Sequence, residues 1–228
     1  RVARAAGDEL AALELLRQYA IRVDGEAGSM ARAAEIYYDM GRLDEARELA
    51  LRSREVTFHE KAQRVLGLVA YRRGEYSQAA LHLERADADY LVLAALLRSH
   101  LLEGALGKVP DDLERIEKLS EPPDALLRLA SEARAALRRR EELARHARGP
   151  GLDRAVCAEY ALRSGVAAPR VEALARGDDP LSRAVRARLA LEKGRLRDAA
   201  SLAEASLKGW PELDLALLVR GRARLEQD

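Results

Sequence analysis

The sequence predicts an all-α fold built from pairs of antiparallel helices that follow one another along the chain. Three observations predict it. Glycines recur at positions 7, 41, 74, 107, 165 and 194, with gaps of 34, 33, 33, 58 and 29 residues, and such self-similarity is typical of a repeat array. Ala and Leu supply 83 of the 228 residues, a composition that favours helices. No stretch shows the alternating pattern of a strand.

The clearest repeat covers residues 60–86, and it predicts two short amphipathic helices. Each expected helix carries apolar residues at helical spacing on one face: Leu66, Val69 and Ala70 in the first, and Tyr76, Ala79, Leu83 and Ala86 in the second. Gly74 should end the first helix, because glycine enters the left-handed conformation of a helix end without steric cost. Gly67 and Ala79 are small enough to let the two backbones approach closely.

This repeat resembles the tetratricopeptide repeat. The resemblance is carried by the Leu66–Gly67 pair, a glycine seven residues later, an aromatic residue two further on, and then Ala79 and Ala86. Alignment on the turn glycine brings out two more full copies, around Gly41 and Gly194, and the last copy departs from the family at Arg186, a position that is usually apolar. The resemblance implies a right-handed superhelical solenoid of antiparallel helix pairs, with about six repeats, of which the middle ones are degenerate.

The same alignment divides the chain into four parts. We expect a partial N-terminal repeat at 1–26, two well-formed repeats at 27–87, degenerate helical repeats at 88–149, and, at 150–228, a degenerate repeat, one well-formed repeat and a final single helix.

The middle of the chain departs most from the repeat pattern. Tyr90–Glu103 is apolar almost all round, so we expect it to be buried on more than one side. Gly107 marks a degenerate turn, and Pro110 should begin a helix at Asp111. Asp112 occupies the position of the small alanine, which predicts a looser or shifted helix contact in this unit.

Residues 124–148 contain no turn signal. They form either one long helix or a hairpin bent near Arg138–Arg140 without glycine, and we favour the hairpin. A short unit should follow at 153–176, and the last well-formed hairpin should begin near Pro180, before a final helix from Pro211.

Catalytic and metal-binding patterns are absent from the sequence. It has no phosphate-binding glycine loop, no nucleophile elbow and no His-Glu-x-x-His helix. The four histidines lack a second ligand at helical spacing: His59, His82, His100 and His146. Cys157, the only cysteine, excludes an internal disulfide, and its apolar neighbours indicate a buried structural thiol. We therefore predict no enzyme activity, no cofactor and no metal.

Charge and hydropathy limit the partners. The formal net charge is +1, which gives no bulk field toward nucleic acid. Residues 128–154 hold eight arginines against four acidic residues, but neighbouring helix residues point in different directions and no aromatic side chain is interleaved to stack bases. Nucleic-acid binding is therefore the weaker alternative. The longest apolar run, Tyr90–Leu97, is too short to span a membrane.

The resemblance implies where a partner would bind. In tetratricopeptide arrays the first helices of successive repeats line a concave face that receives peptide segments or partner proteins. The residues of this chain at those positions are Ala31, Glu35, Tyr38, Asp39, Lys61, Arg64, Leu68, Tyr71 and Arg72. The two tyrosines recur one repeat apart and suit recognition, although packing against a neighbouring helix is an equal alternative. Binding of chaperone tails, which relies on asparagines in this groove, is disfavoured because the chain has no asparagine.

The predicted function is that of a non-catalytic scaffold or adaptor that binds a protein or peptide. The alternative is a regulatory or sensor segment of a larger protein, such as a kinase, an NTPase or a transcription activator, because the chain begins with Arg1 inside a repeat. Homo-oligomerisation through apolar solenoid ends is a further hypothesis.

Overall fold

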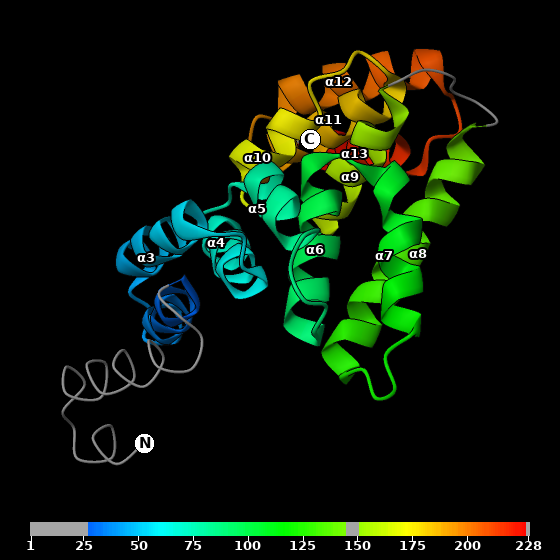
Figure 1. Cartoon of the computed structure of the whole chain (residues 1–228). Coiled ribbons are helices and arrows are strands. Elements are labelled where there is room, and N and C mark those ends of the chain that lie inside the picture. The colour runs from blue at the N-terminus through cyan, green and yellow to red at the C-terminus, as the bar shows by residue number, and fades with distance from the viewer. Residues whose placement is uncertain (1–26, 145–150, 227–228) are drawn as a thin grey trace. The chain divides into compact units, whose positions relative to one another are not determined.

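The computed structural model describes residues 27–144 and 151–226, and all regular secondary structure in these ranges is helical (Figure 1). This agrees with the predicted all-α helical-repeat solenoid. The chain divides into two compact units, an N-terminal unit at Arg1–Ser99 and a C-terminal unit at His100–Asp228. The expected partial repeat at 1–26, including Gly7, lies outside the described residues.

The described residues of the N-terminal unit contain two helical hairpins. Its helices are residues 27–39, α3 (Leu43–Val56), α4 (Glu60–Arg72), α5 (Tyr76–Leu83) and the first part of α6 (Tyr90–Glu103).

The C-terminal unit begins inside α6 and continues with a short 3₁₀ turn and seven α-helices among its described residues. These are η1 (Leu106–Lys108), α7 (Val109–Glu117), α8 (Asp124–Ala144), α9 (Leu152–Arg163), α10 (Ala168–Leu174), α11 (Pro180–Glu192), α12 (Leu196–Gly209) and α13 (Asp214–Leu225).

The turn glycines lie at the bends between paired helices, as predicted. Gly41, Gly74, Gly165 and Gly194 all have positive φ, between 68° and 77°, a conformation that costs glycine no steric penalty. At the bend after α4, the amide of Gly74 donates to the carbonyl of Tyr71 at 3.0 Å and the amide of Glu75 donates to the carbonyl of Ala70 at 2.9 Å. This pair of bonds is the Schellman motif, which satisfies carbonyls that a helix end would otherwise leave free.

The turn predicted at Gly107 is wrong by three residues. Gly104 has the positive φ, +85°, and the amide of Ala105 donates to the carbonyl of His100 at 2.9 Å to close the end of α6. Gly107 lies within the 3₁₀ turn η1 instead. The chain has two glycines close together here, and spacing alone selected the second.

Small residues bring the paired helices together, and the contact shows that the pair is antiparallel. Gly67 lies seven residues before the turn glycine and Leu83 nine residues after it, yet a Cβ built on Gly67 would lie 2.5 Å from Leu83 Cγ. The alanines three positions after the second helix begins, Ala46, Ala79 and Ala199, are all fully buried. The helix crossings therefore depend on Gly and Ala, as the spacing predicted.

A buried serine closes the opposite end of two hairpins. The hydroxyl of Ser53 donates to the carbonyl of Ala27 at 2.7 Å, and the hydroxyl of Ser206 donates to the carbonyl of Pro180 at 2.6 Å. Each serine lies twelve residues after its turn glycine, and Ala86 is the equivalent residue in the repeat between. Each hydroxyl thus ties the end of the second helix to a backbone carbonyl of the first helix.

The hairpin favoured for residues 124–148 is wrong over its described part. Asp124–Ala144 forms one helix, α8. Its buried residues Ala133, Ala136 and Leu143 keep helical spacing across Arg138–Arg140, and no Gly or Pro in α8 interrupts the backbone. The sequence therefore contains nothing to break the helix.

The other expectations for the middle of the chain are met with one correction. Most of α6 is buried, as its apolar sequence predicted. Asp112 is not loosely packed: it is 2% exposed, and its Oδ2 lies 2.6 Å from His100 Nδ1, which is also buried. A side-chain pair occupies the position that alanine fills elsewhere. Helix α7 begins at Val109 and α13 at Asp214, each slightly displaced from the predicted start.

Candidate functional site

The residues predicted to face a partner come from two helices of the N-terminal unit, residues 27–39 and α4. We call the solvent-facing part of this set the α4 surface. It consists of Glu35, Asp39, Lys61, Arg64, Tyr71 and Arg72.

Three residues of the predicted set lie beneath that surface. Ala31 and Leu68 are 0% and 1% exposed, and Tyr38 is 9% exposed; all three belong to the hydrophobic core of the N-terminal unit. These three side chains pack in the core under the α4 surface, so a partner would contact the α4 surface and not them. The role of the whole set in recognition stays a prediction.

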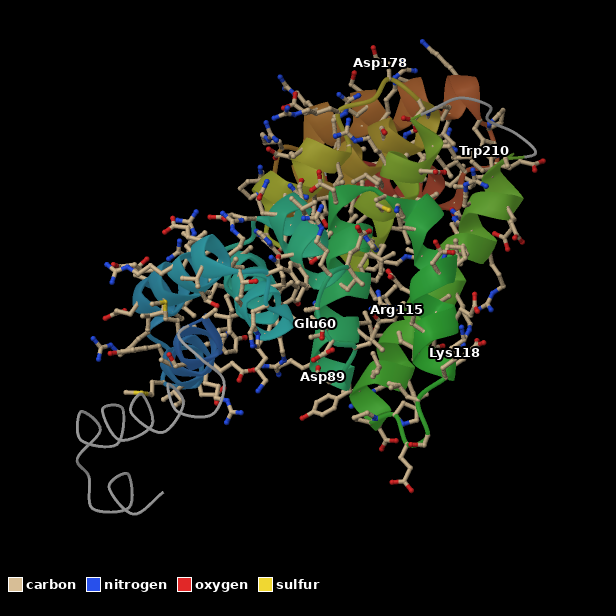
Figure 2. All side chains as sticks on the ribbon, viewed as in Figure 1. Glu60, Asp89, Arg115, Lys118, Asp178 and Trp210 are labelled. Atoms are coloured by element: carbon tan, nitrogen blue, oxygen red, sulfur yellow. The ribbon has the colours of Figure 1, made fainter. Side chains whose placement is uncertain are left out.

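An ion-pair network centred on Arg64 organises the α4 surface. Arg64 Nη1 lies 3.3 Å from Glu35 Oε1, and its Nη2 lies 3.0 Å from Asp89 Oδ2. The other carboxylate oxygen of Asp89 accepts a hydrogen bond from the amide of Val92, in the first turn of α6, at 2.8 Å. Asp89 immediately precedes α6 and is labelled in Figure 2. Arg64 therefore links helix 27–39, α4 and the start of α6.

Burial changes the titration of Glu35 within this network. Desolvation raises the pKa of Glu35, and the charges of Arg64 and Lys61 oppose that rise. The carboxylate is therefore held at some cost, which is reduced by its cationic neighbours.

Both tyrosines of the predicted set have packing partners. The guanidinium carbon of Arg72 lies 5.7 Å from the centre of the Tyr38 ring, and a hydrogen bond with Tyr38 raises the pKa of Arg72. Tyr71 meets Tyr76 edge to face, with ring centres 6.0 Å apart. Tyr71 is half-buried, and burial raises its pKa although Arg98 opposes the shift. Tyr71 therefore combines a fixed ring with an accessible edge.

The described residues include no group of three or more His, Cys, Asp or Glu side chains that could hold a metal ion. Cys157 is fully buried, as predicted, and desolvation raises the pKa of its thiol to about 12. A thiol at that pKa is a poor nucleophile near neutral pH. His82 Nδ1 lies 2.8 Å from Gln63 Oε1, and His100 pairs with Asp112; His146 lies outside the described residues.

Three arginines of the arginine-rich segment at 128–154 pair with carboxylates among the described residues, and the first of them, Arg134, lies 2.6 Å from Glu117. Arg139 binds Glu159 at 3.2 Å and Asp214 at 2.6 Å, and Arg140 binds Asp153 at 2.6 Å. Asp214 lies 75 residues from Arg139 in sequence, so no local pattern could have revealed the pair. The charges of Arg139 and Arg140 are therefore balanced within the protein, which disfavours a basic face built on these two residues.

Two other predictions concern surfaces. None of the helices in 27–144 and 151–226 is long and apolar enough to cross a membrane. Helix α13 carries exposed leucines at Leu217, Leu218 and Leu225; a homo-oligomer formed through them stays a prediction.

Neither a protein-family model nor a curated protein sequence matches the chain. Among solved structures, the chain is similar to a tetratricopeptide repeat protein from Parabacteroides merdae ATCC 43184, with 13% sequence identity, a TM-score of 0.46, and coverage of 97% of this chain and 94% of that chain. The chain's own turn glycines and its Gly- and Ala-lined helix crossings lie where the resemblance to the tetratricopeptide repeat predicts them.

Proposed function

We propose that this chain is a non-catalytic scaffold or adaptor that binds a protein or peptide at the α4 surface. The observation that carries the proposal is the Arg64 network, in which ion pairs join charged side chains of two successive first helices and so order them before a partner binds. Side chains that are ordered before binding lose less conformational entropy when a partner arrives.

The chemistry of the α4 surface favours a polar peptide segment with an apolar or aromatic residue. Asp39 and Arg72 are exposed, while Lys61 and Tyr71 are half-buried. This places charges of both signs beside a tyrosine ring that is fixed by Tyr76. Tyrosine contributes a large contact area at low entropic cost, and it is enriched among residues that dominate binding energy.

Site-specific photocrosslinking tests the proposal. A benzoylphenylalanine in place of Tyr71 should crosslink a protein partner from the lysate of the source organism, and the double change Lys61→Glu plus Arg72→Glu should remove that crosslink. The matched control is the same crosslinker at Tyr90, which is exposed on α6 of the same unit. Equal labelling from Tyr71 and Tyr90, or labelling that ignores the charge reversal, would refute the proposal.

A further inference from the structure

A pocket of about 780 Å³ lies within the C-terminal unit, among α10, α11 and α12. These helices lie together in Figure 1, and α11 packs against both of the others. The pocket is lined by four basic side chains and one carboxylate: Arg176, Arg186, Lys193, Arg195 and Glu172. It therefore carries a marked excess of positive charge.

Only part of this charge is neutralised by the protein. Lys193 Nζ binds Glu172 Oε1 at 2.6 Å, and Arg195 Nη1 lies 3.9 Å from the exposed carboxylate of Asp198. Arg176 is exposed and has no ion pair with any residue of the described ranges. The pocket can therefore accept an anion without first breaking a buried salt bridge.

Arg186 is the most informative residue of the pocket. It lies eight residues before the turn glycine of its repeat, where Leu66 lies in the repeat at 60–86. Leu66 is 4% exposed and lines a groove of about 230 Å³ among α3, α4 and α5. That groove and the pocket occupy equivalent places in their repeats. The groove has an apolar leucine where the pocket has the charged Arg186.

The arginine is incompletely satisfied where it lies. Its Nε is buried and has no hydrogen-bond partner in the described part of the chain. Its Nη2 donates to the carbonyl of Gly177 at 3.2 Å and lies 3.6 Å from Asp178, whose side chain is 89% exposed; Figure 2 labels Asp178. A partly desolvated guanidinium with weak partners destabilises a fold relative to a leucine in the same place. A bound anion would offset that cost.

We propose that this pocket binds the oxyanion of a peptide partner, either a carboxylate of Asp or Glu or the phosphoryl group of a modified side chain. The inference rests on the proposed function, and it assigns a partner chemistry to a second surface. Guanidinium groups bind both oxyanions through paired, charge-assisted hydrogen bonds. Leu189 and Leu202, which also line the pocket, offer apolar contact to the carbon chain that carries the anion.

The test begins with a selection of short random peptides displayed on phage against the full chain. The selected peptides should be enriched in Asp and Glu. Fluorescence anisotropy should then show that Arg186→Leu weakens their binding by roughly tenfold to a hundredfold, the range of a hydrogen bond to a charged group. Arg176→Gln, at an exposed position, provides a second variant that leaves the packing intact.

The matched control is Arg188→Leu, the same change two residues along α11, where Arg188 pairs with Glu192 and does not line the pocket. It should leave the affinity unchanged. Arg186→Leu should melt at or above the temperature of the parent chain, which separates lost binding from lost folding. Replacement of the peptide's Glu by Gln should abolish binding. Replacement of the same Glu by phosphoserine distinguishes the two sources of the oxyanion: tighter binding assigns the phosphoryl group, and weaker binding assigns the carboxylate.

Several outcomes would overturn the inference. These are selected peptides without acidic residues, affinities that survive both Arg186→Leu and Arg176→Gln, loss of binding through Arg188→Leu instead, or displacement of the peptide by oligo-uridine at lower concentration. If Tyr71 crosslinks a partner while the pocket variants have no effect, only this inference fails. If neither surface binds a peptide, the proposed function fails as well.

Discussion

Replacement of Gly67 by alanine tests the closest helix contact in the N-terminal unit. The added Cβ would lie 2.5 Å from Cγ, 2.6 Å from Cδ2 and 3.1 Å from the backbone nitrogen of Leu83. Leu83 is fully buried, so its side chain has little room to rotate away. The short distance to the backbone nitrogen means that a new rotamer cannot relieve the whole clash, and α5 itself must shift.

Two opposing effects set the magnitude. Overpacking of this kind costs about 1–3 kcal/mol, and contact with backbone places the cost near the upper end. Alanine is favoured over glycine in a helix interior by about 1 kcal/mol. We therefore expect Gly67→Ala to lower the free energy of unfolding by about 2 kcal/mol, as measured by urea denaturation followed by circular dichroism.

The control is Gly221→Ala in α13, where an added Cβ meets no heavy atom within 4 Å. This variant gains the helix preference without the clash, so it should equal or exceed the parent chain in stability. The double variant Gly67→Ala plus Leu83→Ala should lose less stability than the two single changes together, because the clash is removed. A Gly67→Ala chain as stable as the parent would refute the packing proposed for α4 and α5.

Three further predictions concern the rest of the fold. Ala46→Leu should overpack the crossing of its hairpin and destabilise the protein by about 1–3 kcal/mol, since Ala46 is fully buried; an unchanged melting temperature would contradict the assigned register. Ser206→Ala should lower stability by about 0.5–1.5 kcal/mol, because it removes the hydrogen bond that ties the end of α12 to the Pro180 carbonyl at the start of α11, and hydrogen exchange at the start of α11 should rise with it. The pKa of Asp214 is lowered: burial would raise it, but hydrogen bonds from Arg139 and the Leu215 amide outweigh that effect. The ionised carboxylate of Asp214 therefore contributes its full stabilisation of the fold above the pKa of an unfolded aspartate, and this stabilisation is lost as the pH falls through and below that value. Urea titrations at falling pH should therefore show a smaller acid-induced loss for Asp214→Asn than for the parent chain.

Part of the candidate site could be predicted from the sequence because the repeat carries its own register. Alignment on the turn glycines placed Glu35 and Arg64 on the inward side of successive first helices, and the structure joins them in one network. The same alignment could not tell which members of the row are covered. Leu68 and Tyr38 are buried because other parts of the unit pack over them, and burial depends on residues distant in sequence.

The pocket in the C-terminal unit shows the same division. Arg186 stood out in the sequence as a charge at a usually apolar position, but its meaning depends on neighbours from α10 and α12. Lys193 and Arg195 follow Arg186 along the chain at the end of α11, but Arg176 approaches it only after α10 packs against α11. A departure from a repeat pattern is thus a useful signal, although the pattern alone does not identify what surrounds the departing residue.

The sequence by itself determined the all-helical class, the four positive-φ bends at Gly41, Gly74, Gly165 and Gly194, and the small residues at the crossings. These features follow from local physics, since a glycine turn or an apolar stripe acts within one or two helices. Only the tertiary structure decided the move of one turn to Gly104, the His100–Asp112 pair and the Arg139–Asp214 pair. Each of these depends on which distant groups are available to bury or pair with a side chain, and that information exists only after the helices have packed.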